Sequence, residues 1–388
     1  MIIGVPREIM NDENRVAATP TTIKAMIADG HEVLVEKDAG IGSYFSDADY
    51  EQVGARILDD VRELYARADL ILKVKEPLYH ETLQMHEVDM MHPGQHLISF
   101  IHPASPSNHA MVTKLAQAGV VALTLDGVPR ISRAQSMDAL TSMSTCAGYK
   151  GMLMAACEYA GFVPQIFSAA GGSKPAKVLV VGAGVAGLQA LATAKRLGAQ
   201  CFALDIRATA LEQAVSLGAK PVESGIPESI SVGEGGYAKA LSDAWLLKER
   251  AAIAAVLPEV DIVYLSALVP GEQAPILIDA DMVQLMKPGS VIMDVSIDQG
   301  GNCALTQGGQ TIKAHHVTIS GIKNIPARLA VSATTMLAHN MLNLLKYFVQ
   351  DNAINLDLND EVVQGMLVCA KGEIVHEGTL AAMQSVTS

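Results

Sequence analysis

The sequence predicts an α/β fold, with two Rossmann-like doubly wound parallel-sheet domains joined by long helices. Half of the 388 residues are hydrophobic but only 4% are aromatic, a composition typical of buried aliphatic strands. Short apolar runs alternate with helical patterns along the chain, which indicates parallel strands joined by crossover helices. The chain is also too long for one ordinary hydrophobic core and suits two domains.

The N-terminal segment begins with two predicted strands and a helix between them. Thr19 suits an N-cap and Pro20 a first helical turn, so we expect a helix from there to about Asp29. The expected strands cover residues 2–5, 32–36, 70–74 and 96–101.

A long helix is expected at 136–159, where the sequence is rich in Ala and Met and lacks proline. A Gly-, Pro- and Ser-rich loop follows at 171–175. A second series of strands is then expected at 178–181, 201–205, 261–265, 290–294 and 317–319.

A helix at 331–349 is expected to return the chain to the first domain, and the alternating tail at 361–376 predicts a hairpin that turns at Lys371-Gly372. The predicted domains are therefore residues 1–138 with 335–388, and residues 139–334.

Charge and composition exclude several kinds of function. The net charge of −13, without a basic patch, argues against a nucleic-acid partner. The five cysteines form no CxxC pair, which is typical of reduced thiols in a cytoplasmic protein. No apolar run reaches the roughly 18 residues of a membrane span. The histidines lack the spacing of metal ligands, so no metal site is expected.

A glycine-rich turn carries the clearest functional signal. The apolar residues 178–181 are followed by Gly182, Gly184 and Gly187 in a GxGxxG pattern, and a helix is expected directly afterwards. In a strand–turn–helix of this kind, the glycines permit a tight turn, a close approach to pyrophosphate and close helix–strand packing. The helix N-terminus then supplies N–H donors to the anion. The sequence therefore predicts a dinucleotide site.

The residues after the next strand favour NAD over NADP. Asp205 lies 18 residues beyond Gly187, where a carboxylate accepts hydrogen bonds from the adenosine ribose and repels a 2′-phosphate. Arg207 instead favours NADP, because an arginine nearby can accommodate that phosphate. We expect the carboxylate to dominate and NAD to be the cofactor.

Several longer segments resemble the alanine dehydrogenase/pyridine nucleotide transhydrogenase family, over essentially the whole chain. The longest is PRISRAQSMD at 129–138, and CAGY at 146–149, GGYAK at 235–239 and GGNC at 300–303 also match. These segments are most similar to the NAD(H)-binding domain that proton-translocating transhydrogenases carry on their alpha subunit.

The resemblance implies a set of site residues. Arg130, Gln135 and Asp138 would lie against the nicotinamide end of the cofactor, in a cleft between the two domains. Thr141 stands where the family has a serine in the same loop, and keeps the hydroxyl. Tyr237 would lie on a mobile loop that closes over NAD(H). The expected cofactor-binding set is completed by Val185, Ala186, Ala267 and Leu268.

The implied activity is hydride transfer between NAD(H) on this chain and NADP(H) on a partner domain, coupled to proton movement through a membrane subunit. Such a domain needs no acid or base of its own, since its task is positioning and exclusion of water. The chain would be one subunit of a split transhydrogenase or an excised domain. It would form a homodimer and associate peripherally with the inner face of the cytoplasmic membrane.

An alternative is a soluble NAD-dependent alanine dehydrogenase, the other branch of the family. Four positions match its site. Arg15 would clamp the substrate carboxylate, and Lys75 would bind that carboxylate or polarise the keto oxygen. His102 would be the acid/base, and Asp298 would hold the amino group or relay a proton. Transhydrogenase domains commonly lose several of these residues. A third hypothesis, a regulatory nucleotide-binding protein without catalysis, has no supporting motif.

Overall fold

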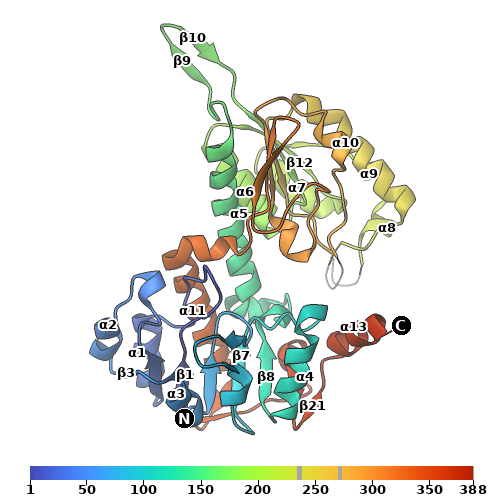
Figure 1. The fold of residues 1–388 in the computed structure, drawn as a ribbon. Coiled ribbons are helices and arrows are strands. Elements are labelled where there is room, and N and C mark those ends of the chain that lie inside the picture. The colour runs from blue at the N-terminus through green and yellow to red at the C-terminus, as the bar shows by residue number, and fades with distance from the viewer. Residues whose placement is uncertain (234–237, 270–272, 388) are drawn as a thin grey trace. The chain divides into compact units, whose positions relative to one another are not determined.

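The computed structural model describes residues 1–233, 238–269 and 273–387, and these form two compact units (Figure 1). Unit 1 comprises Met1–Met143 and Ala327–Ser388, and unit 2 comprises Ser144–Pro326. The long helix α5 (Ala139–Glu158) begins in unit 1 and ends in unit 2. Each unit has its own sheet and its own hydrophobic core.

In the described part of unit 1, the main sheet has eight strands in the order β21-β20-β8-β7-β4-β1-β2-β3. The six strands from β8 to β3 are parallel, and β20 and β21 continue the sheet antiparallel. Their bounds are β1 Ile2–Val5, β2 Glu32–Glu36, β3 Arg56–Leu58, β4 Leu70–Leu72, β7 His96–Ser99, β8 Val121–Thr124, β20 Leu367–Ala370 and β21 Glu373–Ile374. The parallel part has the doubly wound strand order, which reverses between β1 and β4.

Helices cover this sheet, and their ends follow local capping chemistry. The Thr19 side chain accepts a hydrogen bond from the backbone N–H of Thr22 and so begins α1. The main helices of unit 1 are α1 Pro20–Ala28, α2 Asp47–Gln52, α3 Val61–Arg67, α4 His109–Gln117, α11 Ala330–Phe348, α12 Glu361–Met366 and α13 Glu377–Thr387.

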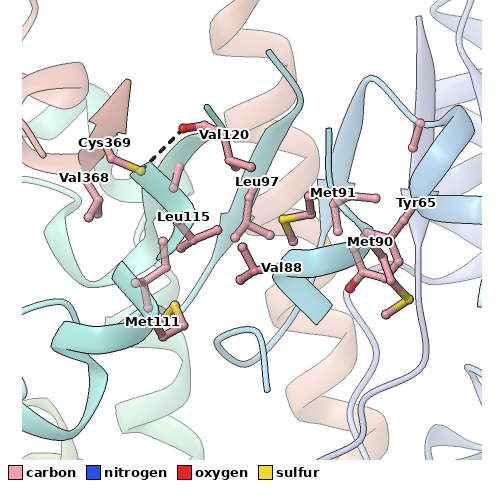
Figure 2. Packing of buried hydrophobic residues seen from close by; sticks show 14 of the residues in the cluster. Tyr65, Val88, Met90, Met91, Leu97, Met111, Leu115, Val120, Val368 and Cys369 are labelled. Atoms are coloured by element: carbon pink, nitrogen blue, oxygen red, sulfur yellow. Dashed lines mark hydrogen bonds between the residues drawn. The ribbon is translucent and has the colours of Figure 1, made fainter. Parts of the chain in front are cut away.

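The core of unit 1 joins segments that are far apart in the sequence (Figure 2). Leu97 and Leu115 are fully buried in one cluster with Val368 from the C-terminal strand β20. Beside them the Cys369 thiol donates a hydrogen bond to the carbonyl oxygen of Val120, with 3.4 Å between sulfur and oxygen. The C-terminal segment is therefore an integral part of the first unit.

In the described part of unit 2, the main sheet has seven strands in the order β13-β12-β11-β14-β15-β17-β16, again the doubly wound order. Only β16 is antiparallel to its neighbour. The strands are β11 Lys177–Val181, β12 Gln200–Leu204, β13 Lys220–Pro221, β14 Ile262–Leu265, β15 Val291–Asp294, β16 Thr311–Ala314 and β17 Val317–Ser320. The helices are α6 Val185–Arg196, α7 Ala208–Ser216, α8 Glu228–Ser231, α9 Asp243–Val256 and α10 Ala280–Val283.

The α/β class, the strands at 2–5 and 32–36, the long helix and the second strand series are confirmed. The loop expected at 171–175 is wrong at its first three residues, because β10 (Gly171–Ser173) pairs with β9 (Ile166–Ser168) in a hairpin. Glycines give no alternation of side chains, so their sequence resembles a loop. The hairpin stands away from the main sheet of unit 2 (Figure 1).

The C-terminal hairpin is shorter than expected. Residues 361–366 form α12, because the Asp360 side chain accepts a hydrogen bond from the N–H of Val362 and caps a helix there. The hairpin itself, β20 and β21, turns at Lys371-Gly372 as predicted, and both turn residues have positive φ. Strands β3 and β8 were not predicted, and β3 has only three residues, too few for a clear pattern.

None of the described helices is both long enough and apolar enough to cross a membrane.

Candidate functional site

The predicted glycine turn joins β11 to α6 and needs glycine at two positions for steric reasons. Gly182 has a φ of +89°, and a Cβ there would lie 2.7 Å from the backbone of Ser266 and Ala267. At Gly187 a Cβ would lie 2.0 Å from the carbonyl oxygen of Gly182. The strand, the turn and the helix can therefore approach one another only without side chains at these positions.

Gly184, the remaining glycine of the pattern, faces open space instead. A Cβ at Gly184 would meet no atom within 4 Å, and this residue begins α6 without a side-chain cap. None of the described residues accepts a hydrogen bond from the backbone amides of Val185, Ala186 or Gly187. Unpaired amides at a helix N-terminus, with open space before them, fit an anion such as a pyrophosphate.

Asp205 follows β12 and is only 8% exposed. One carboxylate oxygen, Oδ2, accepts hydrogen bonds from the Ala183 amide (2.8 Å) and Arg207 Nη2 (2.9 Å). The other, Oδ1, accepts from the Arg207 amide (2.8 Å) and Arg207 Nε (3.0 Å). The hydrogen bond with Asp205 raises the pKa of the Arg207 guanidinium. Asp205 thus fastens the glycine turn and holds Arg207 in an ion pair, an arrangement the sequence did not reveal.

The loop after β14 lies against the glycine turn. The Ser266 hydroxyl donates to the carbonyl oxygen of Gly182 at 2.8 Å. The side chain of Asn302 forms two hydrogen bonds with the backbone of Ala267. The Ala267 amide donates to Asn302 Oδ1 (3.0 Å), and Asn302 Nδ2 donates to the Ala267 carbonyl oxygen (2.9 Å). Leu268 follows and is 39% exposed. Two of the predicted cofactor-binding residues, Ala267 and Leu268, are thereby placed beside the turn.

A buried aspartate organises the neighbouring segment. Asp294 ends β15 and accepts hydrogen bonds at Oδ2 from the amides of Asn302 (2.9 Å) and Cys303 (3.0 Å) and from the Thr306 hydroxyl (2.9 Å). Burial raises the pKa of Asp294, although these donors oppose the shift. Sequence reasoning assigned no role to Asp294 or Asn302, although the GGNC segment had marked the region.

Asp298 lies on a short 3-10 helix (Val295–Gln299) that follows β15, and its side chain is exposed. It belongs to unit 2, whereas Arg15, Lys75 and His102 belong to unit 1.

In unit 1, chemically active side chains follow the carboxyl ends of neighbouring parallel strands. Lys75 follows β4, His102 follows β7 and Asp126 follows β8, and these strands are adjacent in the order β4-β7-β8. Ligands of doubly wound sheets bind at this edge, next to the point where the strand order reverses.

His102 forms an ion pair with Asp126, with 2.8 Å between Nδ1 and Oδ1, and its side chain is 43% exposed. Its backbone amide also donates to Asp126 Oδ2 at 2.8 Å, with His102 at a φ of +48°. Burial lowers the pKa of His102. The charge of the Asp126 carboxylate and the hydrogen bond to it raise this pKa by more, so the net shift is upward. A histidine oriented through Nδ1 in this way is suited to proton transfer through Nε2.

The other two predicted substrate residues of unit 1 differ in their surroundings. Arg15 is 3% exposed and forms a two-pronged ion pair with Glu13, with 2.7 Å from Nε to Oε1 and 2.5 Å from Nη2 to Oε2. The amide of Lys75 donates to Glu8 Oε2 at 3.3 Å, and no described carboxylate forms an ion pair with its ammonium group. A nearby acceptor, Glu76 Oε2, is buried and has no hydrogen-bond partner in the structure as described.

The buried lysine of this region is Lys73, which the sequence reasoning missed. Its Nζ lies 2.8 Å from Glu87 Oε1 and 3.4 Å from Glu8 Oε2, with all three side chains almost fully buried. Burial raises the pKa of Glu8 to about 7, despite the opposing charge of Lys73. Glu8 Oε1 also accepts a hydrogen bond from the Val74 amide at 2.6 Å, and so fixes the start of the loop that carries Lys75.

The PRISRAQSMD segment forms a 3-10 helix (Ser132–Met137) that packs against α11. Asn340 and Asn343 both donate to the carbonyl oxygen of Ser136, at 2.9 and 3.0 Å. Arg133 forms an ion pair with Asp360 at 2.9 Å. The segment is therefore held by contacts that the sequence pattern alone did not specify.

Within this segment, Arg130 and Gln135 are exposed. Asp138 accepts hydrogen bonds from the Thr141 amide (2.8 Å, at Oδ1) and the Thr141 hydroxyl (2.6 Å, at Oδ2), in the manner of a helix cap for α5. Tyr237 lies outside the described residues. Across the described chain, no group of three or more His, Cys, Asp or Glu side chains is arranged to hold a metal ion.

Comparisons with known proteins agree over nearly the whole chain. Two family models match: the alanine dehydrogenase/PNT N-terminal domain at residues 4–147, and the corresponding C-terminal domain at residues 151–377. The chain is 40% identical to an NAD(P) transhydrogenase subunit alpha protein of Rhodospirillum rubrum, over 97% of this chain and 98% of that protein. It is 40% identical to the NAD(P) transhydrogenase subunit alpha of Haemophilus influenzae, over 96% of this chain and 71% of that protein.

Alanine dehydrogenases are more distant relatives. The enzyme of Bacillus subtilis is 31% identical over 97% of this chain and 93% of its own length. Among solved structures, a transhydrogenase from Sinorhizobium meliloti is 36% identical with a TM-score of 0.84, covering 97% of this chain and all of that one. An L-alanine dehydrogenase is 28% identical with a TM-score of 0.80, and the match covers both chains completely. The chain therefore belongs to the alanine dehydrogenase/pyridine nucleotide transhydrogenase family.

Proposed function

We propose that this chain is the NAD(H)-binding component of a proton-translocating NAD(P) transhydrogenase. The glycine turn of unit 2, with open space at Gly184 and unpaired amides at the start of α6, carries the cofactor assignment. The greater identity to transhydrogenase alpha subunits (40%) than to the Bacillus subtilis alanine dehydrogenase (31%) supports the choice of reaction.

In this function the chain binds and positions NAD(H), and the bound nicotinamide supplies the hydride. The amides of residues 185–187 hold the pyrophosphate, and Asp205 stands at the adenosine ribose. Arg130, Gln135 and Asp138 orient the nicotinamide end, with Thr141 hydrogen-bonded to Asp138. Because hydride passes between two nicotinamides, positioning and exclusion of water account for the catalysis.

The partners in this proposal are an NADP(H)-binding subunit and a membrane subunit, with the chain peripheral on the cytoplasmic face. A homodimer is also proposed, and the β9–β10 hairpin supports it. Phe167 on this hairpin is 78% exposed and Phe162 just before it is 62% exposed. Large aromatic side chains are enriched where protein surfaces associate.

The test is reconstitution with the NADP(H)-binding and membrane subunits of a transhydrogenase relative. We expect NADPH to reduce 3-acetylpyridine-NAD only when this chain is present. A folded chain that binds NADH and assembles with the partners, but gives no reduction, would overturn the proposal.

A second candidate function is NAD-dependent oxidation of L-alanine, favoured by the His102–Asp126 pair and the adjacent Lys75. Purified chain would be assayed with L-alanine and NAD, beside a His102→Gln variant. Turnover of about 1 s⁻¹ or more that the variant loses would establish a substrate site on this chain. Absence of turnover, with NADH binding intact, would exclude the activity.

A further inference from the structure

Asn302 is a fully buried residue whose side-chain amide uses its whole hydrogen-bonding capacity inside unit 2. Its Oδ1 accepts hydrogen bonds from the Ala267 amide (3.0 Å) and the Ser296 hydroxyl (2.6 Å). Its Nδ2 donates to the carbonyl oxygens of Ala267 (2.9 Å) and Pro275 (2.8 Å). An aspartate of the same shape could not donate when ionised, and a leucine could do neither, so only an amide makes this set of bonds.

The backbone of Asn302 is held as firmly as its side chain. Its amide donates to Asp294 Oδ2 at 2.9 Å. Its carbonyl oxygen accepts hydrogen bonds from the amides of Leu277 (2.8 Å) and Ile278 (3.0 Å), which are both fully buried. A buried polar network in which every group is paired is rigid. The core of unit 2 therefore fixes the direction in which the Asn302 side chain points.

The loop that Asn302 holds lies directly against the glycine turn. The Ser266 amide donates to the carbonyl oxygen of Val181 at 2.9 Å, and the Ser266 hydroxyl donates to that of Gly182 at 2.8 Å. A Cβ at Gly182 would lie 2.7 Å from the backbone nitrogen of Ala267. Because Asn302 binds both the amide and the carbonyl of Ala267, it determines how this loop is placed beside the turn.

The strand order assigns this loop to one half of the dinucleotide. In unit 2, β11 has β12 on one side and β14 on the other. A doubly wound sheet binds a dinucleotide across the point where the strand order reverses, with one mononucleotide at each half of the sheet. Asp205 follows β12 and marks the adenosine half. The loop at 266–268 follows β14 and so lies on the side of the nicotinamide half.

We propose that Asn302 is a positioning residue for the nicotinamide half of the bound dinucleotide. It acts through Ala267 and Leu268, whose backbone it holds beside the glycine turn, and it does not itself touch the cofactor. This inference rests on the proposed function, in that a dinucleotide must bind at the glycine turn. It goes beyond the glycine motif, which accounts for the pyrophosphate and the adenosine ribose.

The experiment compares the binding of NADH with that of ADP, which carries adenosine and the pyrophosphate group but no nicotinamide. Isothermal titration calorimetry of the full chain gives both dissociation constants. The variants are Asn302→Ala, Ser296→Ala, which removes one hydrogen bond to Asn302, and the control Ser290→Ala. Ser290 and Ser296 lie on either side of β15, and each is 1% exposed. The Ser290 hydroxyl donates to the carbonyl oxygen of Lys287 at 2.5 Å, at the end of β15 away from the site.

We expect Asn302→Ala to bind NADH about tenfold more weakly, because the released loop must be ordered again when the nicotinamide binds. Ser296→Ala should bind NADH about threefold more weakly, since it loses a single hydrogen bond. ADP affinity should stay within about twofold of wild type in both variants, and Ser290→Ala should change neither ligand by more than this.

Each other outcome has a distinct meaning. Equal weakening of NADH and ADP assigns Asn302 a structural role and overturns the inference, as does unchanged NADH affinity in a folded Asn302→Ala variant. Thermal unfolding checks the fold, and if Asn302→Ala does not fold, Ser296→Ala decides in the same way. An equal loss of NADH affinity in Ser290→Ala also overturns the inference. Failure of the wild-type chain to bind NADH would overturn the proposed function itself.

Discussion

Gly184 and Gly187 lie in the same turn but differ in what an added methyl group would meet. At Gly187 it would overlap the backbone of Gly182, whereas at Gly184 it would enter open space. One glycine is therefore required for packing between helix and strand, and the other for access of a ligand. Substitution by alanine can separate these two roles.

We expect Gly187→Ala to lower the free energy of unfolding by about 1–3 kcal/mol, because the backbone must shift to admit the methyl group. Gly184→Ala should unfold at the wild-type temperature, since Gly184 has a φ of −75° that alanine readily adopts. It should bind NADH at least about tenfold more weakly, because the methyl group occupies the space expected for pyrophosphate. Thermal unfolding and NADH fluorescence distinguish the two effects. Wild-type affinity in Gly184→Ala would show that the pyrophosphate does not bind there.

The second prediction at the scale of residues concerns the raised pKa of His102. A raised pKa means that the folded state favours protonated His102. The stabilisation is complete below the unfolded-state pKa of about 6.5 and is lost as pH rises through the folded-state pKa. Asp126→Asn removes the anion that causes the shift. In an NMR titration, His102 should then show a lower pKa, while the pKa of His31, which burial lowers, should not change. An unchanged His102 pKa would mean that another group causes the shift.

Among the structural elements, the β9–β10 hairpin has features of an association surface. An isolated two-stranded hairpin is only marginally stable in water, and this one carries an exposed phenylalanine on a ribbon outside the main sheet. Burial of Phe167 against a second copy would stabilise both the hairpin and the proposed dimer.

We therefore expect Phe167→Ser to weaken dimerisation at least about tenfold, the effect of losing about 1.4 kcal/mol of apolar burial. Sedimentation equilibrium would compare the mass of the variant with twice the chain mass of 40.9 kDa. Val215→Ser on α7 serves as the control, because Val215 is also an exposed apolar residue (45%) of unit 2. Unchanged association in Phe167→Ser would exclude the hairpin as the dimer contact.

At the scale of the whole molecule, the two units have separate sheets and separate cores, and their stabilities should respond to different changes. Lys73 is the cation between the buried carboxylates of Glu8 and Glu87 in unit 1. The glycine turn lies in unit 2.

Calorimetry of the full chain should resolve these dependencies. Lys73→Met leaves buried carboxylates without their cation and should lower the stability of unit 1 by about 3–5 kcal/mol. NADH at 100 times its dissociation constant should stabilise unit 2 by about 2.7 kcal/mol. A single transition that both changes shift equally would contradict separate unfolding of the units.

Elements with a local sequence signal were predicted, whereas elements without one were missed. Strand β2 and the glycine turn were predicted because their signals are local: an apolar run, glycines at fixed spacing and a following helix. The fold class followed from the alternation of such elements. Strand β3 and the β9–β10 hairpin were missed because three residues, or glycines, leave no readable pattern.

The sequence by itself determined the two doubly wound sheets and the place of a dinucleotide turn, because both depend on residue types at short separations along the chain. Only the tertiary structure decided the partners of the charged groups. The pairing of His102 with Asp126, 24 residues away, and of Asn302 with Ala267, 35 residues away, arises where strands bring distant segments together.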